Sequence, residues 1–386
     1  VYFNSANGQN IFQNKTEHTT GNTFWYEIYP NILAWHLGHL YPEEEKFNLL
    51  LKTVADQLRD STFVLSGSKS PEAVANFDYT AFDFIAMEPR DNNTWKEPDA
   101  AAAYAYLLYL AYERWGEKQY LVAAKQSLNF LDQLPEKKNP FYEILLPFGV
   151  YTAAKMNAEL GTDYDVQKMI EWIYGPGEAR FGFGVIANNW AGYDCHGLVG
   201  SIIHGGGYAF AMNGYGSIAA AAPVARYDEH YARVLGKWAL NLANASRLFY
   251  GNGLPPEHQS SYQWLKKHDP DFVIAYEGLM RIWEGISPRA MGDPLVHDWG
   301  LTDLGLYGSS HVGYLAALIE KTNVEGILQL DLLATDFTHA KAYPTYLYYN
   351  PFTNERSVEF EIPTGTVDLY DAVANSYLAK GVSAKT

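Results

Sequence analysis

Apolar residues recur at helical spacing over most of the first 320 positions of this 386-residue chain. Phe24, Ile28, Ile32 and Trp35 lie three or four residues apart, which is the period of one helix face and predicts a helix over 22–40. The same pattern predicts further helices over 42–59, 97–115, 118–134, 140–160, 165–172, 217–225, 228–249, 271–284 and 306–321. Because helices joined by short turns pack as antiparallel neighbours, we expect a series of helical hairpins.

The pattern changes at about position 343. The stretch VEFEI (358–362) alternates apolar and acidic residues, which is typical of a half-buried strand. The dipeptide Asn350-Pro351 and the stretch 363–365 (PTG) are turn signals. We therefore predict an α-domain over 1–340 and a small antiparallel β module over 341–386. Since the sequence ends inside this module, we expect the module to be truncated.

The segment 181–216, FGFGVIANNWAGYDCHGLVGSIIHGGGYAFAMNGYG, follows neither the helical nor the alternating period. Each glycine costs conformational entropy on folding, so we expect this irregular segment to line a site. The alternative is a long surface loop with incidental polar residues. Its amides, rings, acid and imidazoles suit a carbohydrate, because rings stack on sugar faces while amides and carboxylates bind hydroxyls. These groups belong to Asn188, Asn189, Trp190, Tyr193, Asp194, His196, His204 and Tyr208.

Composition supports a glycan as the ligand. The chain has 30 Tyr against 19 Phe, together with 10 Trp, and such a surplus of amphipathic rings fits a cleft for neutral sugars, although an aromatic-rich core accounts for many of them. The net charge of −16 argues against nucleic-acid binding, which needs clustered Lys and Arg. No apolar run reaches about 18 residues, so we expect no membrane span. The sequence begins without a basic-then-apolar leader, so we expect any signal peptide to be absent or already removed.

Cofactor and metal motifs are missing. The single cysteine, Cys195, excludes an intramolecular disulfide and a cysteine-based zinc cluster. HExxH, EF-hand, P-loop and dinucleotide patterns do not occur, so we predict neither metal nor cofactor. The run HGGG from His204 is similar to an esterase oxyanion turn, but the GxSxG nucleophile turn is absent.

The order of the predicted elements, helical hairpins with long aromatic loops and a β module behind them, resembles the (α/α) toroid folds of carbohydrate-active enzymes. These include six-hairpin glycosidases and toroid polysaccharide lyases. The C-terminal NPFTNERSVEFEIPTGTVDLYDAVANSYLAKG is similar to β-sandwich appendages of many glycosidases. The resemblance is architectural and covers most of the chain. It implies a mainly α, (α/α)6-type toroid with its site among loops at one end of the barrel.

Glycoside hydrolysis needs two carboxyl groups that flank the scissile bond. Candidates in aromatic or glycine-rich surroundings are Asp194, Glu277, Asp298 and Asp303. Glu277 lies in the apolar run FVIAYEGLM, where burial would raise its pKa as a general acid requires. The alternative for Glu277 is an ordinary helix ion pair with Arg281, four residues on.

A polysaccharide lyase would use other groups. It removes the proton beside a uronate carboxyl with Tyr or His, and an amide or Arg neutralises the carboxylate. The resemblance to toroid lyases implies Asn, His and Tyr in these roles, and Asn189, His196, His204 and Tyr208 match in type. The alternative for each histidine is a hydrogen-bonded structural imidazole.

We therefore expect a secreted or cell-surface bacterial enzyme that hydrolyses a poly- or oligosaccharide. A polysaccharide lyase is the first alternative, and a non-catalytic glycan-binding protein is the second. The residues expected to bind substrate are Asn188, Trp190, Tyr193, Trp264, Trp299, Tyr307 and Arg180.

Overall fold

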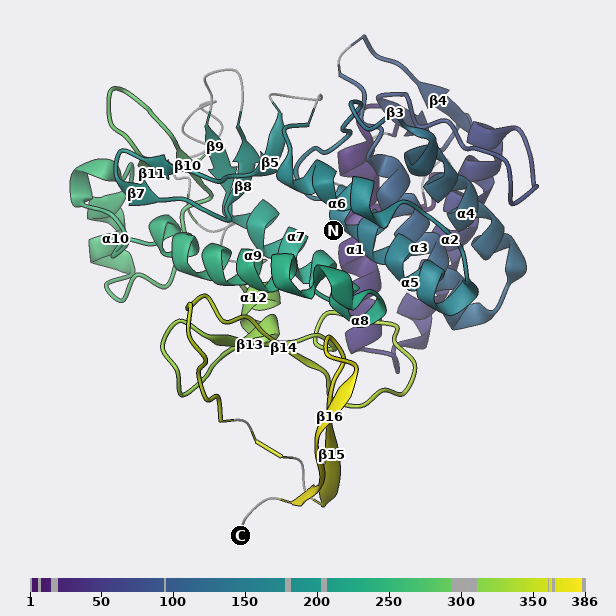
Figure 1. Cartoon of the computed structure of the whole chain (residues 1–386). Coiled ribbons are helices and arrows are strands. Elements are labelled where there is room, and N and C mark those ends of the chain that lie inside the picture. The colour runs from purple at the N-terminus through teal and green to yellow at the C-terminus, as the bar shows by residue number, and fades with distance from the viewer. Residues whose placement is uncertain are drawn as a thin grey trace.

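The structure, a computed structural model, describes residues 2–5, 8–14, 20–93, 95–177, 182–202, 207–292, 304, 311–359, 361–362 and 365–383. Helices form 43% of it and strands 18%. The main helices are α1 (Phe24–Leu40), α2 (Glu45–Ser66), α3 (Ala100–Trp115), α4 (Lys118–Gln133), α5 (Leu146–Leu160), α6 (Val166–Tyr174), α7 (Ala211–Ala221), α8 (Val224–Tyr227), α9 (Ala232–Ala245), α10 (Tyr262–His268) and α12 (Val312–Leu318). Figure 1 shows α1 to α6 gathered on one side of the molecule.

The helices lie in an inner row and an outer row. In the inner row α1 contacts α3, α3 contacts α5, α5 contacts α7 and α7 contacts α12, while α2, α4, α6 and α9 pack outside. Composition explains the division: every residue of α3 from Ala100 to Ala111 is buried, as is all of α7, because both helices are apolar or small on every side. By contrast, α2 buries only one stripe, including Leu51, Val54 and Leu58.

Glycines end three of these helices where the sequence places its turns. Gly67, Gly116 and Gly161 follow α2, α3 and α5 with φ of 64°, 70° and 66°. This left-handed conformation favours glycine and stops the helix. The predicted helices over 22–40, 97–115 and 118–134 are confirmed to within a few residues at either end.

Beside the helices lies an antiparallel sheet in the order β11-β10-β9-β8-β5. Its strands are β5 (Phe183–Val185), β8 (Val199–Ser201), β9 (Tyr208–Phe210), β10 (Gly278–Met280) and β11 (Arg289–Met291). Small residues let neighbouring strands of this sheet approach closely. A Cβ on Gly200 of β8 would lie 2.0 Å from the carbonyl oxygen of Tyr208 on β9. A separate hairpin, β6 (Asn189–Trp190) with β7 (Tyr193–Asp194), leaves the sheet between β5 and β8.

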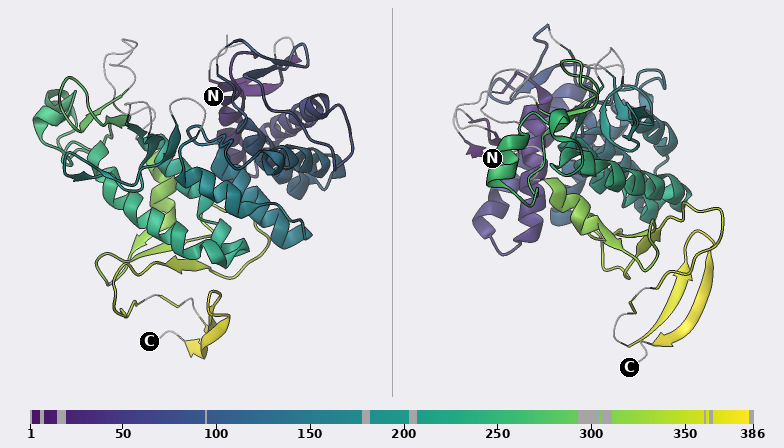
Figure 2. Two further views of the ribbon diagram at one scale, coloured as in Figure 1. Left: turned by 45° about the horizontal axis from the view of Figure 1, so that its top comes forward. Right: turned by 90° about the vertical axis from the view of Figure 1, so that its left-hand side faces the viewer.

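The remaining described strands are short. The pair β1 (Tyr2–Asn4) and β2 (Ile11–Gln13) and the pair β3 (Ala81–Asp83) and β4 (Glu88–Arg90) lie near α1 and α2. Strands β12 (Ile319–Lys321), β13 (Leu328–Asp331) and β14 (Tyr346–Tyr348) form a three-stranded sheet. The hairpin of β15 (Thr366–Asp371) and β16 (Ser376–Ser383) projects away from the body (Figures 1 and 2).

The predicted mainly α toroid is wrong, because the structure is mixed α and β. The glycine-rich segment supplies β5 to β9 rather than only an irregular loop, and the predicted helix over 271–284 contains β10 instead. The described part of the predicted strand over 358–362 forms none, and the strands lie further on, in β15 and β16. Three-residue strands are too short to show alternation, and an apolar run such as FVIAYEGLM suits a buried strand as well as a helix.

The domain boundary predicted at 340/341 stays a prediction. One sheet crosses that position, since β14 pairs with β13. None of the described helices has both the length and the apolar composition of a membrane span.

Candidate functional site

The hairpin β6–β7 carries several of the predicted site residues. Ala191 and Gly192, with φ of 47° and 89°, form its two-residue turn, and two positive φ values in succession are typical of a tight hairpin turn. Asn189 lies directly opposite Asp194 across the two strands. Asn188 and Asn189 are exposed, so the hairpin presents amides and a carboxylate to solvent.

Asp194 is held as a carboxylate by its neighbours. It accepts hydrogen bonds from the backbone N–H of His196 at 3.0 Å and from His196 Nδ1 at 2.6 Å. Partial burial raises the pKa of Asp194, but these two bonds and the positive charge of Arg247 outweigh burial and hold the pKa below its usual range. Asp194 is therefore ionised at neutral pH and orients the imidazole of His196.

The hairpin is anchored to the sheet through the loop that precedes α10. Tyr193 packs against His258 with 5.7 Å between ring centroids, and His258 Nδ1 bonds to the carbonyl oxygen of Pro288 at 2.7 Å. Next in the chain, Gln259 bridges to Ala290 on β11, the neighbour of β10. A continuous path of contacts thus links Asp194 to β10.

Glu277 lies at the other end of that path, immediately before β10. It is 3% exposed, and its carbonyl oxygen accepts a hydrogen bond from the N–H of Ala211, the first residue of α7, at 3.0 Å. Because this stretch is extended, Arg281 is not one helical turn away, and its N–H bonds to Gly207 instead. The alternative for Glu277, an ion pair with Arg281 along one helix, is therefore wrong.

Tyr208 lies on the strand next to Glu277. It pairs with Met280 across β9 and β10, and a Cβ on Gly278 would lie 2.6 Å from its ring. Tyr208 is half-buried, and it packs edge-on against Phe210 with 4.3 Å between centroids.

Two of the tryptophans predicted to bind substrate, Trp190 and Trp264, lie in the described part of the chain, and they differ in exposure. Trp190 is 4% exposed and belongs to the hydrophobic core, so its ring is not presented at the surface. Trp264, on α10, is 43% exposed and stacks on His268 with 4.8 Å between centroids. The other predicted site residues lie outside the described part of the chain: Arg180, His204, Asp298, Trp299, Asp303 and Tyr307.

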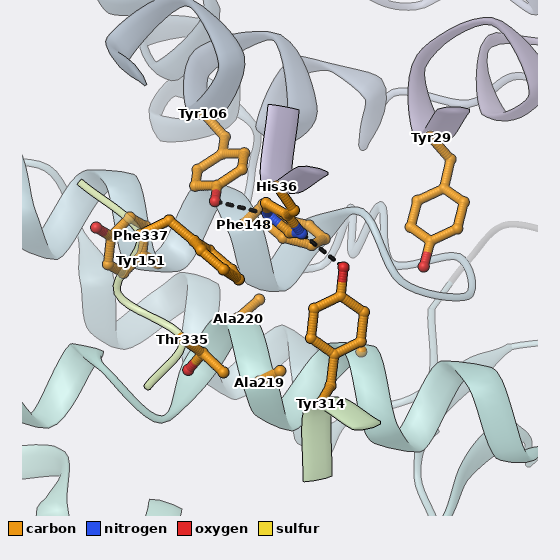
Figure 3. A pocket seen from close by; sticks show the side chains of 11 residues that line it. Tyr29, His36, Tyr106, Phe148, Tyr151, Ala219, Ala220, Tyr314, Thr335 and Phe337 are labelled. Atoms are coloured by element: carbon orange, nitrogen blue, oxygen red, sulfur yellow. Dashed lines mark hydrogen bonds between the residues drawn. The ribbon is translucent and has the colours of Figure 1, made fainter. Parts of the chain in front are cut away.

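A buried histidine and tyrosine cluster at the centre of the helices did not emerge from the sequence. Figure 3 shows His36, from α1, between two hydroxyls: Nδ1 lies 2.6 Å from Tyr314 Oη and Nε2 lies 2.9 Å from Tyr106 Oη. A second imidazole, His311, bonds to Tyr29 Oη at 2.7 Å. The only sequence signal is tyrosine and histidine placed among apolar residues on the inner helices.

The cluster surrounds a small cavity rather than a substrate site. The space open to water centres is about 10 Å³, which is about what a single water needs. Thr335 lines this cavity, and its Oγ1 is buried without a hydrogen-bond partner among the described residues. Burial lowers the pKa of His36 to about 3 and that of His311 to about 4, so both imidazoles are neutral.

Charged residues extend the cluster on one side. Asp336, 1% exposed, accepts hydrogen bonds from Tyr151 at 2.6 Å, Tyr227 at 2.8 Å and Arg226. Nearby, the fully buried Lys155 pairs with Glu113 at 2.7 Å. This network fastens the segment around Asp336 to α5 and α8.

No metal centre is evident within the part of the chain that the structure describes, where no three His, Cys, Asp or Glu side chains gather as ligands. No family model, curated protein or solved structure matches the chain.

Proposed function

We propose that this protein is a secreted enzyme that hydrolyses glycosidic bonds of a poly- or oligosaccharide. The observation that supports the proposal is the contrast between two carboxyl groups on linked elements. Glu277 is 3% exposed beside β10, whereas Asp194 is exposed on the hairpin β6–β7 and has a lowered pKa. Two carboxyl groups in opposite environments are the arrangement from which a general acid and a base arise.

The two roles follow from the surroundings. Glu277, the buried carboxyl group of the two, is assigned the role of the general acid, which gives a proton to the leaving oxygen. Asp194, which His196 and Arg247 keep ionised, is assigned the role of the general base that activates water. His196, bonded to the same carboxylate, fixes its orientation.

Sugar binding is assigned to the exposed and partly exposed groups of the hairpin and of α10. Asn188 and Asn189 offer amides, and Tyr193 and Trp264 offer ring faces. Trp190 does not join them, because its ring is buried.

A second candidate function, β-elimination on a uronate, is supported by the same hairpin. Asn189 faces Asp194, and His196 forms a hydrogen bond with that carboxylate. A carboxylate that accepts a hydrogen bond from an imidazole makes that imidazole a stronger base. An amide close by can donate hydrogen bonds to the carboxylate of a uronate. In this second function His196 removes the proton beside the uronate carboxyl group, and Asn189 neutralises the charge of that carboxylate.

One experiment separates the two functions: a panel of neutral and uronate polysaccharides, followed by reducing ends and by the ultraviolet absorbance of unsaturated uronates. Hydrolysis produces reducing ends without absorbance, and that result is expected on a neutral substrate. Reducing ends together with ultraviolet absorbance would instead show that the protein cleaves by β-elimination. The absence of both signals across the panel would overturn the proposed function.

A further inference from the structure

A groove separate from the hairpin site lies where the C-terminal hairpin meets the body. It encloses about 600 Å³, within the range of small-ligand sites. Three elements form its walls: the start of α9 with the turn before it, the end of β14, and the turn of the hairpin β15–β16. Figure 1 shows the upper end of this hairpin close to α8 and β14.

One wall of the groove is aromatic. Tyr348 and Tyr349 line it side by side, and both are partly exposed. Arg233 lies over the ring of Tyr349 at 5.5 Å, and a Cβ on Gly236 would lie 2.7 Å from Tyr349 Cβ. Arg233 and Gly236 both belong to α9, so Tyr349 is held against this helix.

Other residues that line the groove supply polar groups. Asp371 contributes a carboxylate whose Oδ1 accepts from the N–H of Ala374 at 3.0 Å, which fixes its orientation. Asn350 is fixed in the same way by the N–H of Phe352 at 2.9 Å. Glu229 and His230 also line the groove, and both are exposed.

The charges in the groove select the class of ligand. Two carboxylates, Glu229 and Asp371, line the groove together with one guanidinium, Arg233. An anionic ligand would meet net repulsion from this groove and from a chain of net charge −16. Fixed rings with carboxylates and an amide bind a ligand that offers apolar faces and many hydroxyls.

We propose that this groove is a second, non-catalytic site that binds a neutral oligosaccharide. The inference takes from the proposed function only that glycans are the ligands of this protein. It gives the hairpin β15–β16 a role, since the hairpin supplies Asp371 and Val373 to the site.

The test counts binding sites by calorimetry in a Glu277→Gln background, in which the proposed function predicts that turnover is lost. The probes are cello-, malto-, manno- and xylohexaose, with a hexamer of galacturonate as the acidic comparison. We expect two sites for one neutral hexaose, and Tyr349→Ala should weaken one of them about 5- to 100-fold. Tyr349→Phe should keep that site, because the ring remains.

Tyr343→Ala is the matched control, because Tyr343 is 89% exposed and lies outside the groove. If Tyr349→Ala destabilises the fold, Asp371→Asn and Arg233→Ala, two exposed or half-exposed groups, replace it. A single site that none of these variants weakens would overturn the inference while leaving the proposed function intact. Two sites, together with a parent protein (Glu277 intact) that hydrolyses no polysaccharide of the panel, would support the groove and contradict the proposed function.

Discussion

At the scale of single residues, burial separates side chains that look alike in the sequence. His36 and His196 each form hydrogen bonds, yet His36 is buried among tyrosines and His196 is half-exposed beside Asp194. The environment therefore assigns the first to the scaffold and the second to the candidate site.

The buried histidines make stability depend on pH. An ordinary histidine has a pKa of 6.5, whereas burial lowers that of folded His36 to about 3. Between these pH values the unfolded chain binds a proton at this histidine that the folded protein excludes. The contribution of the neutral His36 to the free energy of unfolding is therefore fully present above pH 6.5 and is lost as the pH falls towards 3. The expected slope is about 1.4 kcal/mol per pH unit for each such histidine.

Urea unfolding between pH 7 and 5 measures this slope. We expect His36→Gln to flatten it, although the variant is also less stable at pH 7 because it loses hydrogen bonds to Tyr106 and Tyr314. The exposed His230 is the control, and His230→Gln should leave the slope unchanged. Equal slopes in the parent and in His36→Gln would contradict the burial of a neutral His36.

The neighbours Trp190 and Tyr193 should respond differently to truncation. Trp190 is a core residue at 4% exposure, so Trp190→Ala should lower the free energy of unfolding by about 3–5 kcal/mol. Tyr193 is partly exposed on the candidate site, so Tyr193→Ala should weaken oligosaccharide binding by about 1–3 kcal/mol with a smaller effect on stability. Unfolding and binding measurements on both variants test this, and parent-like stability of Trp190→Ala would refute it.

At the scale of elements, the sequence identifies long helices well and short strands poorly. The helix α1 spans more than four turns, so its apolar period is repeated enough to be recognised, and Pro30 is accommodated within it. Strands β8 and β9 have three residues each, among them Gly200 and Ala209. Strand β9 is paired on one side with β10, which lies far along the chain. Such pairing depends on tertiary contacts that local periodicity does not contain.

The segment around Asp336 is fastened by a buried ion pair. Replacement by Asp336→Asn leaves Arg226, whose side chain is 13% exposed, without its carboxylate, and breaking such a pair costs about 3–5 kcal/mol. We expect that loss in urea unfolding. The exposed Asp163 is the control, since Asp163→Asn should change stability by less than about 0.5 kcal/mol. If the two variants were equally stable, the network would not hold this segment.

At the scale of the whole molecule, the many tyrosines lie in two kinds of place, the core and the surface. Tyr104, Tyr106 and Tyr151 fill the core between the inner helices, whereas Tyr193, Tyr348 and Tyr349 are partly exposed. The sequence predicts an irregular segment over 181–216, whereas the structure has strands and the hairpin β6–β7 in its described part. The burial expected for Glu277 is confirmed. It does not indicate the groove at the C-terminal hairpin, because residues more than 100 positions apart form its walls.

The central claim is that Glu277 donates the proton in glycoside hydrolysis. The most direct test is the turnover of Glu277→Gln on the substrate that gives the most reducing ends, with the exposed Glu325→Gln as the matched control. Glutamine keeps the shape of the side chain but cannot supply the proton, so we expect turnover to fall by about 10²- to 10⁴-fold while the fold and Glu325→Gln stay at parent level. Parent-level turnover by Glu277→Gln would contradict the account.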